Sequence, residues 1–559
     1  MIRYKNTIAL ILCLIAVLSL FGTPGSEIGF GFRSILPPLF AILLALISRE
    51  VILALLGGIW LGASYLAGGN PVSGLFGTVD HHLVNALADS DHAFILLFSL
   101  MLGGMVGIIG AAGGAAGIVQ KISRWAKTPS SGQIAAWAMG IFIFFDDYAN
   151  TLIVGNTFRP LTDRLRISRE KLSFIVDATA APIASIALIS TWIGFEVGLI
   201  ADGLVPVGAI ENSSEAYAIF IETIPYRFYP LFMLLLVFLI GAWNRDFGSM
   251  LKAENRCRTT GKVLADTARP LAGSKSTDLS KVEVTSKSWL WGIIPIAVVI
   301  IATFAGLIVD GRSKLGAEAA NVPLYRVISE ANSFAVLMWS SFLGALCAGI
   351  LGSSGAGLKL SETLEAFVDG IKVMTAAAIV LLLAWSIGGI CNEMGTADYI
   401  VQISKNILSP HLIPALTFII AGIIAFATGT SWGTLSILMP IVAPLSYSFP
   451  IQAGLSNGVC HGIMVSTIGA VLAGSVFGDH ASPISDTTVL SSMASGADHI
   501  DHVRTQIPYA LTAAFIGLLI GYIPSGFGVS PWISLPLGAL AVILTLRIFG
   551  RRVENGTVA

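Results

Sequence analysis

The chain has 559 residues and a formal net charge of −1 at pH 7, with 55% hydrophobic and only 12% charged residues. A soluble domain carries roughly 25% charged residues, and apolar runs near the spanning length of about 20 residues recur here from end to end, so the composition excludes a soluble globular protein. These runs are predicted to be helices, because a helix satisfies its own backbone hydrogen bonds inside lipid.

The first predicted element is an apolar span within residues 1–32. Arg3 and Lys5 precede the run IALILCLIAVLSLF, as in a signal peptide, but no small-residue cleavage site follows. We therefore predict a retained N-terminal span. The five cysteines show no C-x-x-C or other metal spacing, so we expect no disulfides and no cofactor.

Residues 33–242 form the first predicted membrane repeat, and the distribution of lysine and arginine indicates its orientation. The loops at 68–92 and 201–216 contain acidic residues but no Lys or Arg, so both are placed outside. The basic segments at 121–127 and 159–171 are placed inside. Together with the rest of the chain, this pattern predicts about twelve spans, with both termini in the cytoplasm and the protein in a bacterial inner membrane.

A broken or re-entrant hairpin is predicted at 133–161, where the stretch FFDDYANT follows an apolar run. Asp147 and Thr151 are four residues apart and share a helix face, as do Asp146 and Asn150. Like-charge repulsion and desolvation favour retention of a proton by one of the adjacent carboxyl groups near neutral pH. Capping of a helix end by these residues is the alternative interpretation.

Other polar and small residues of the first repeat have weaker signals. Asp177 and Glu196 stand in apolar surroundings and are secondary candidates for an ion site, with a pore-lining or structural role as the alternative. Two G-x-x-x-G steps predict close approach of a neighbouring helix, at Gly103, Gly107, Gly110 and Gly114.

The segment 243–288 is the one long polar interruption of the chain. Its lysines and arginines are dispersed and share the segment with acidic residues, which favours a cytoplasmic linker between two membrane halves and argues against nucleic-acid binding.

Residues 289–525 form the second predicted repeat, because three stretches of the first half have counterparts here in the same order. FSLMLGGMVGIIG aligns with LAWSIGGICNEMG, IVQKIS with IVQIS, and APIASIALIST with SPISDTTVLSS. On the predicted topology the helix with FSLMLGGMVGIIG runs inward, and its counterpart with LAWSIGGICNEMG runs outward. The sequence thus predicts an all-α membrane protein with two inverted-topology repeats, as in many secondary transporters; chance similarity of apolar stretches is the alternative.

Asn392 and Glu393, which follow the two glycines of LAWSIGGICNEMG, are interpreted as a helix terminus. Residues 526–559 complete the chain with a last span and a basic cytoplasmic tail.

Two interrupted stretches of the second repeat carry many of its polar groups, a hairpin at 412–446 and the segment GDHASPISDTT. A charge at the bilayer centre costs at least about 2.5–3.5 kcal/mol, so a carboxylate there is a functional candidate. Helix breaks free backbone carbonyls, and carboxylates with neutral oxygens suit a small, hard cation. The predicted cation and proton site comprises Asp486, Asp479, Asp146, Asp147, Ser482, Ser485, Thr487, Thr430, Thr434 and Asn150.

Within this set, Asp486 and Asp479 are expected to hold Na⁺. Capping of a half-helix by the aspartates and hydrogen bonding between helices by the hydroxyls are the alternatives.

Two further side chains in these stretches are secondary candidates. An unperturbed histidine titrates near pH 6.5, so His480 is a candidate pH sensor, with a structural histidine as the alternative. Ser431 is central to GTSWG, which matches the G-x-S-x-G motif of hydrolases, with His461 downstream. Because that motif requires a strand–turn–helix context and only membrane helices are predicted here, we predict that the protein is not an enzyme.

The stretches GDHASPISDTTVLSS and GTSWGT closely resemble the signature of the NhaC family of bacterial sodium/proton antiporters, and FFDDYANTLIVGNTFRPLTDRLRISREKL resembles the first-half segment of its longer members. The resemblance covers roughly residues 33–545 and implies an ion-coupled membrane transporter with inverted repeats. Ala481 departs from the pattern, since many relatives have cysteine there. The resemblance leaves the substrate open, because related transporters exchange organic acids or amino acids.

We therefore expect exchange of Na⁺ for H⁺, in which the two ions bind one carboxylate, chiefly that of Asp486, in a mutually exclusive way. Rocking of one repeat against the other would expose the group to each side in turn. The alternative is a Na⁺- or H⁺-coupled transporter or exchanger of a small organic acid or amino acid. The expected partners are small ions, such an organic substrate and the lipid bilayer, and homodimer formation is left open.

Overall fold

The computed structural model describes residues 30–48, 50–114, 126–270, 288–316, 330–404 and 408–553, with a few single positions between these ranges. Nearly all regular structure in the described part is helical, and its strands are the two-residue pair β1 (Arg245–Asp246) and β2 (Arg551–Arg552), which run antiparallel. The predicted all-α class is confirmed. Residues 1–29 of the predicted N-terminal span lie outside the described residues.

Ten described helices are long and apolar enough to span a membrane, and two bent pairs raise the number to twelve if each pair is one span. The bent pairs are α3 (Val51–Leu66) with Pro71–Ala88, at 118°, and Ser213–Tyr226 with α14 (Phe228–Trp243), at 48°. The ten are Gly31–Ser48, α6 (Ser90–Ala111), α16 (Leu290–Leu315), α18 (Ser333–Ser354), α19 (Leu360–Glu393), Pro410–Thr428, α22 (Ser431–Gln452), α23 (Asn457–Ala481), His499–Gly526 and α27 (Pro531–Ile548).

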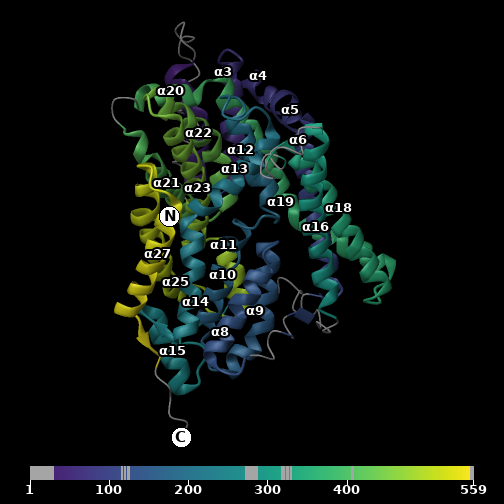
Figure 1. The fold of residues 1–559 in the computed structure, drawn as a ribbon, viewed down its shortest axis with the longest axis vertical. Helices are drawn as coiled ribbons and strands as arrows, with labels where there is room; N and C mark the ends of the chain where they lie inside the picture. The colour runs from purple at the N-terminus through teal and green to yellow at the C-terminus, as the bar shows by residue number, and fades with distance from the viewer. Residues whose placement is uncertain are drawn as a thin grey trace.

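Each half of the chain contains a hairpin followed by a broken helix. In the first half, α8 (Pro129–Phe142) and α9 (Asp147–Arg164) form the hairpin, and α10 (Arg169–Ala178), α11 (Ala181–Ala184) and α12 (Ile193–Leu204) form the broken helix. In the second half, the hairpin is α21 (Ile413–Thr428) with α22, and α23 breaks before α24 (Asp486–Ser495). Figure 1 places α8 and α9 at one end of the molecule and α21 and α22 toward the other.

The long helices α6 and α19, which contain the stretch FSLMLGGMVGIIG and nearly all of its aligned counterpart LAWSIGGICNEMG in the two predicted repeats, pack antiparallel. A Cβ added at Gly103 would lie 3.0 Å from the carbonyl oxygen of Gly370, and one at Gly107 would lie 2.2 Å from that of Ala366. Residue numbers rise along α6 as they fall along α19, so the two helices run in opposite directions. This contact confirms the predicted close packing, and inverted repeats require these directions.

The other two glycines of that motif differ from each other. A Cβ at Gly114 would lie 2.4 Å from the backbone nitrogen of Gly292 in α16, so this glycine also permits a close contact. Among the described residues, none lies within 4 Å of a Cβ added at Gly110. The described part of the chain thus shows the predicted packing at three of the four glycines.

The two ends of the molecule differ in charge. Residues 68–92, acidic in the sequence, include α4 (Pro71–Gly77) and α5 (Val84–Ala88), and Figure 1 shows these helices at the end opposite to α8, α9 and α15 (Gly248–Thr260). The basic segment 159–171 and β2 belong to the latter end. The acidic and basic segments thus lie at opposite ends, as the topology requires.

The first part of the predicted linker is folded onto the membrane helices. Lys171 of α10 forms a buried ion pair with Asp246 of β1, and the hydroxyl of Tyr509 donates to the same carboxylate at 2.8 Å. One face of α15 is buried, including Cys257. Dispersed polar residues in the sequence do not indicate this docking, because the partners lie far along the chain.

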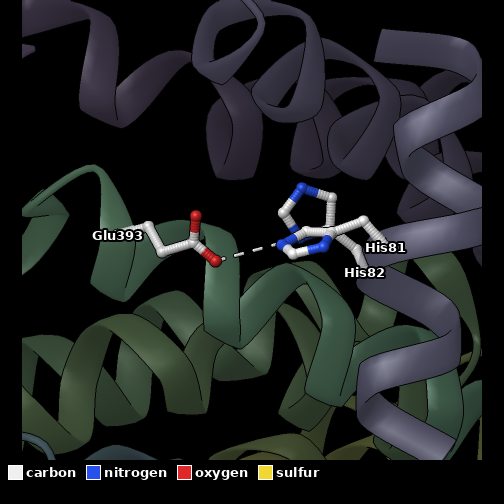
Figure 2. A group of neighbouring side chains, drawn as sticks. All are labelled: His81, His82 and Glu393. Carbon is white, nitrogen blue, oxygen red and sulfur yellow. Dashed lines mark ion pairs between the residues drawn. The ribbon is translucent and has the colours of Figure 1, made fainter. Parts of the chain in front are cut away.

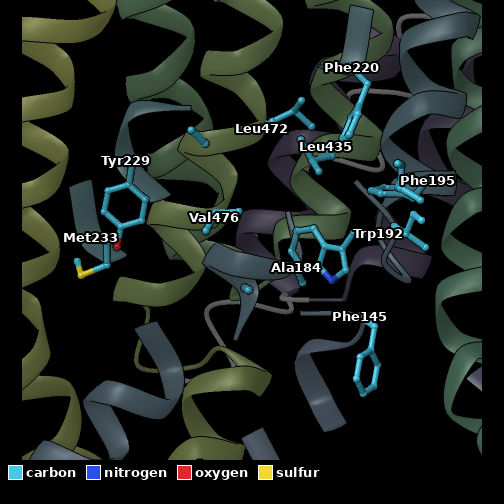
Figure 3. Packing of buried hydrophobic residues seen from close by; sticks show 14 of the residues in the cluster. Phe145, Ala184, Trp192, Phe195, Phe220, Tyr229, Met233, Leu435, Leu472 and Val476 are labelled. Carbon is cyan, nitrogen blue, oxygen red and sulfur yellow. The ribbon is translucent and has the colours of Figure 1, made fainter. Parts of the chain in front are cut away.

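The hydrophobic core joins the two halves. Figure 3 shows part of it, with Trp192 and Phe195 of the first half in the same cluster as Leu435, Leu472 and Val476 of the second. The broken helices of both halves are thereby held against each other by apolar side chains, and the polar groups at the breaks are fixed in position.

The contact between α6 and α19 predicts a specific sensitivity to side-chain volume. Gly370→Ala places a methyl group about 2.2 Å from the carbonyl oxygen of Gly103, and because backbone atoms cannot rotate away, we expect a loss of about 1–3 kcal/mol of stability. The measurement is the thermal unfolding midpoint of the purified protein in detergent.

Gly389→Ala on the same helix is the matched control, since nothing lies within 4 Å of its added Cβ. Its midpoint is expected to be unchanged or slightly raised, because alanine favours helix over glycine. Equal midpoints for the two variants would show that the helices do not approach as described.

Candidate functional site

The helix breaks of both halves meet at one cavity of about 140 Å³. A water molecule needs roughly 10–15 Å³ of such volume, so the cavity has room for several waters or a hydrated ion. Its wall comprises the tip of each hairpin, the break of each broken helix and one face of α19: Asp146, Asp147, Tyr148, Thr191, Trp192, Val373, Met374, Ala376, Ala377, Val380, Thr430, Trp432, Asp479, Asp486 and Thr487.

A glycine brings the second hairpin to the neighbouring break. Gly429 ends α21 with φ +73°, in the left-handed region, and an added Cβ would lie 2.7 Å from the carbonyl oxygen of Ile484. Only glycine combines this conformation with so close an approach. The tip at Thr430 is therefore positioned against residues 482–485, which separate α23 from α24.

The first half supplies two almost fully buried carboxylates, each 3% exposed. Asp146 is the N-cap of α9 and accepts hydrogen bonds from the backbone N–H of Ala149 at 2.7 Å and the hydroxyl of Thr191 at 3.1 Å. Asp147 accepts from the backbone N–H of Tyr148 at 3.1 Å. Asp146 thus performs the capping role considered from the sequence and also lines the cavity.

The second half supplies the other two carboxylates. Asp479, near the end of α23, accepts from the hydroxyl of Ser431 at 2.8 Å, and its other oxygen has no hydrogen-bond partner in the described part of the chain. Asp486 begins α24, lines the cavity and is the exposed member of the four. It accepts from the backbone N–H of Thr487 at 2.8 Å and from the hydroxyl of Tyr148.

The contact between Tyr148 and Asp486 joins the two halves directly across the cavity. Sequence reasoning did not select Tyr148, nor Thr191, Trp192 and Trp432. Aromatic and hydroxyl residues are common in membrane helices, and the available signal was the position of Tyr148 beside two aspartates.

The cavity wall contains no Lys, Arg or His among the described residues. Two basic side chains buried elsewhere already have acidic partners. Arg227 pairs with Glu196 at 2.8 Å, and Lys171 pairs with Asp246. Four carboxylates therefore share one partly closed space without a basic neighbour in its wall. Charges in such surroundings require neutralisation by a proton or a counter-ion.

The predicted neutral ligands divide into two groups. Thr430 and Thr487 line the cavity. Thr434, Ser482 and Ser485 do not line it, and their hydroxyls bond to the backbone or to a neighbour. Thr434 donates to the carbonyl of Thr430 at 2.9 Å, Ser482 donates to that of Phe426 at 2.8 Å, and Ser485 caps α24 and contacts the Thr487 hydroxyl at 3.0 Å. Their side chains shape the breaks.

Asn150 likewise lies outside the cavity wall. Its amide nitrogen donates to the carbonyl oxygens of Gly140 at 2.6 Å, Ile143 at 3.2 Å and Thr179 at 2.8 Å. These bonds tie the two arms of the first hairpin to each other and to the end of α10. The structure therefore gives Asn150 a positioning role behind Asp146 and Asp147.

Of the secondary candidates, Ser431 is the one bonded to a cavity carboxylate, as described above. Its hydroxyl also contacts the carbonyl of Ser475 at 3.2 Å, and it begins the helix α22. No strand precedes it, so the strand–turn–helix context of a hydrolase is absent at this site. His461 pairs with Glu222 at 2.7 Å on the surface and has no hydrogen bond to Ser431 in the structure.

The remaining secondary candidates lie outside the cavity wall. Asp177 accepts from the Thr488 hydroxyl at 2.9 Å and the Gln506 amide at 2.7 Å. His480 contacts the hydroxyl of Tyr229 at 2.5 Å. Glu196 is in the buried pair with Arg227. The sequence places Arg227 at a membrane interface, whereas the structure buries it fully beside Glu196.

A membrane fold in which two inverted repeats bring broken helices to one polar cavity defines a secondary transporter. The profile of the Na⁺/H⁺ antiporter family matches residues 183–527. The chain belongs to this family of membrane transporters, which is not an enzyme family.

Relatives and a solved structure agree with this assignment. An uncharacterized protein of Haemophilus influenzae is 31% identical over 527 residues, covering 92% of this chain and 94% of that protein. The malate-2H(+)/Na(+)-lactate antiporter of Bacillus subtilis is 29% identical over 178 residues, 30% of this chain and 35% of that protein. The Na(+)/H(+) antiporter NhaC of Alkalihalophilus pseudofirmus is 26% identical over 161 residues, which cover 28% of this chain and 32% of that protein.

Among solved structures, the YdaH transporter of Alcanivorax borkumensis superposes with a TM-score of 0.54 at 12% identity, covering 82% of this chain and 90% of that one. This likeness shows the fold. The predicted resemblance to the NhaC family is thus confirmed by the family match and by the relatives.

The role of Asn150 leads to a prediction about stability. Asn150→Ala leaves three backbone carbonyls without this donor, and loss of a buried hydrogen-bond partner costs about 1–3 kcal/mol. We expect a lower thermal unfolding midpoint for the purified variant. Asn156→Ala is the control, because this exposed residue on the same helix donates only to Leu152, at 2.9 Å. A midpoint for Asn150→Ala equal to that of the control would argue against the positioning role.

Proposed function

We propose that this chain exchanges Na⁺ for H⁺ across the inner membrane of a bacterium. The observation that supports the proposal most strongly is the cavity itself, in which four carboxylates are gathered with no basic side chain in the described wall. Such a site has a strong preference for cations. Oxygen ligands are the ones that small, hard cations bind, and the same oxygens bind protons.

Competition between the two ions produces exchange. A carboxylate in a poorly solvated site binds a proton, and it binds Na⁺ only after that proton has left. When the site faces one side, Na⁺ displaces a proton, and when it faces the other side a proton displaces Na⁺. The name of the family supports these two ions as the substrates.

Asp486 is proposed as the principal carrier because of its place in the cluster. Asp146 and Asp479 each accept a hydrogen bond from a hydroxyl of their own half, at 3.1 and 2.8 Å. Asp486 instead lines the cavity as the exposed member of the four, and its side-chain donor, Tyr148, comes from the other half. An ion at Asp486 would therefore sit between the two repeats, where alternating access requires the site to be.

Hydroxyl groups would complete the coordination of Na⁺. Thr430 and Thr487 line the same cavity as Asp486 and carry neutral oxygens. A proton needs no such set of ligands. The hydroxyls thus favour Na⁺ binding to the ionised site, and the carboxylates bind whichever ion is present.

Coupled exchange of a small organic acid or amino acid is the second candidate. It is favoured by the similarity to the malate-2H(+)/Na(+)-lactate antiporter and by a cavity larger than one bare ion needs, with an apolar wall from α19. The lack of a basic side chain in the described wall argues against direct binding of an organic anion. On this alternative, the aspartates hold the coupling ion.

A proton-gradient assay tests the proposal. In everted vesicles with an established proton gradient, added NaCl should dissipate the gradient, which a pH-sensitive dye reports. Asp486→Asn should abolish the response, because an amide cannot alternate between a proton and Na⁺. Asp369→Asn is the control, since this aspartate is 60% exposed and pairs with Lys372 outside the cavity.

The same assay separates the two candidates. A response to malate, lactate or an amino acid with no response to NaCl would favour the second candidate and reject Na⁺/H⁺ exchange. Full activity of Asp486→Asn with NaCl would reject the assigned carrier.

A further inference from the structure

A second cluster of ligand-type side chains lies outside the cavity described above. His81 and His82 belong to a short π-helix, η2 (Thr78–Leu83), and Glu393 is the last residue of α19. One ligand atom from each residue lies within 4.8 Å of the other two. Figure 2 shows the two rings and the carboxylate directed toward one another from the two elements. More than 300 residues separate the contributing segments in the sequence.

The local backbone makes this meeting of consecutive histidines possible. Single π-helical turns are rare and occur frequently at functional sites. Here the two imidazole rings are 4.9 Å apart between centroids, at an interplanar angle of 81°. The Asn85 side-chain amide lies 3.3 Å from Nδ1 of His81. With the Asn85 amide turned so that its oxygen accepts from Nδ1–H, Nε2 of His81 is free to bind a metal ion.

The arrangement is open where the three groups face each other. Nδ1 of His82 is 3.9 Å from Oε1 of Glu393, too far for a hydrogen bond. His81 is exposed and Glu393 is 49% exposed, whereas His82 is 8% exposed. The site is therefore reachable from solvent and is anchored on one side by a buried ring.

We propose that His81, His82 and Glu393 form a binding site for a divalent transition metal ion, with Zn²⁺ as the representative. Two imidazoles and one carboxylate are a ligand set that zinc uses, with bond lengths of about 2.0–2.2 Å and a fourth position left to water. The donor atoms would need to move closer by side-chain rotation, which the exposure of two of the three groups permits. Imidazole nitrogens distinguish this site from the oxygen-lined cavity, which suits Na⁺.

A metal ion bound here would connect η2 to the end of α19. Glu393 ends the single helix α19, and Val373 to Val380 of that helix supply one wall of the cavity. A metal bridge from η2 to Glu393 would restrain rigid-body movement of α19 and slow the transport cycle. This consequence rests on the proposed function, whereas metal binding itself does not.

The cluster lies at a defined end of the molecule. Figure 1 shows α4 and α5, which flank η2, at the end opposite to α15. On the topology predicted from the sequence, this end faces outward. The metal ion would then act from outside the cytoplasm.

Direct binding is the first test. The full-length protein is purified in detergent with a tag that contains no histidine, and Zn²⁺ binding is measured by titration calorimetry. We expect His82→Ala and Glu393→Gln each to weaken binding at least about tenfold, because a ligand of the metal is lost. His461→Ala is the matched control, since His461 is a surface imidazole that also faces a carboxylate, that of Glu222. Equal affinity of all four proteins would overturn the proposal.

Two further measurements separate this inference from the proposed function. Asp486→Asn should bind Zn²⁺ like the unaltered protein, because it lies in the other site; loss of zinc binding in this variant would place the ion in the cavity and overturn the proposal. Zn²⁺ should slow transport by the unaltered protein several-fold and leave His82→Ala unaffected. Zinc binding with no effect on transport would show that the bound metal ion does not restrain α19.

Discussion

The structure depends on the gathering of four carboxylates, three of them buried, in one space whose described wall holds no basic side chain. Each charge loses hydration on entering the protein, and the cost is several kcal/mol for an unpaired ion. The protein uses ion pairs elsewhere, as between Arg227 and Glu196, so their absence from the cavity wall is specific to this place. On the proposed function, small cations or protons stabilise this site, and its occupancy would follow the ion concentrations on the side to which it is open.

The two halves contribute to this site in a complementary way. Asp146 and Thr430 occupy equivalent positions, since each is the N-cap of the second helix of its hairpin and accepts from a backbone N–H three residues on. In the first half the hairpin carries the acids and the break carries the hydroxyl of Thr191. In the second half the hairpin carries the hydroxyl, and the break carries Asp479 and Asp486. Each repeat thus brings two carboxylates, and a relative movement of the repeats changes the spacing of the charges.

Sequence reasoning found the acids and the breaks because both are rare in apolar helices and carry a large cost there. It did not distinguish Thr430, which lines the cavity, from Ser482, whose hydroxyl donates to the carbonyl of Phe426. A hydroxyl bonds equally well to a ligand or to the backbone, and only the three-dimensional path of the chain decides between them. The same limit applies to Arg227 and to His82, whose acidic partners lie 31 and 311 residues away in the chain.

Helix α19 connects three parts of the molecule, which are α6, the cavity and η2. Its Gly370 packs on α6, a face of apolar side chains closes the cavity, and its last residue, Glu393, lies beside His82 of η2 at one end of the molecule. Helices move as rigid bodies more readily than they deform, because each residue is held in the hydrogen-bonded ladder. The close backbone contact at Gly103 and Gly370 leaves no room for the two helices to approach further. Helix α19 can therefore slide along α6 or move together with it. Either movement would alter the cavity wall and the η2 end of the molecule together. Alternating access requires such a link between a central site and an end of the molecule.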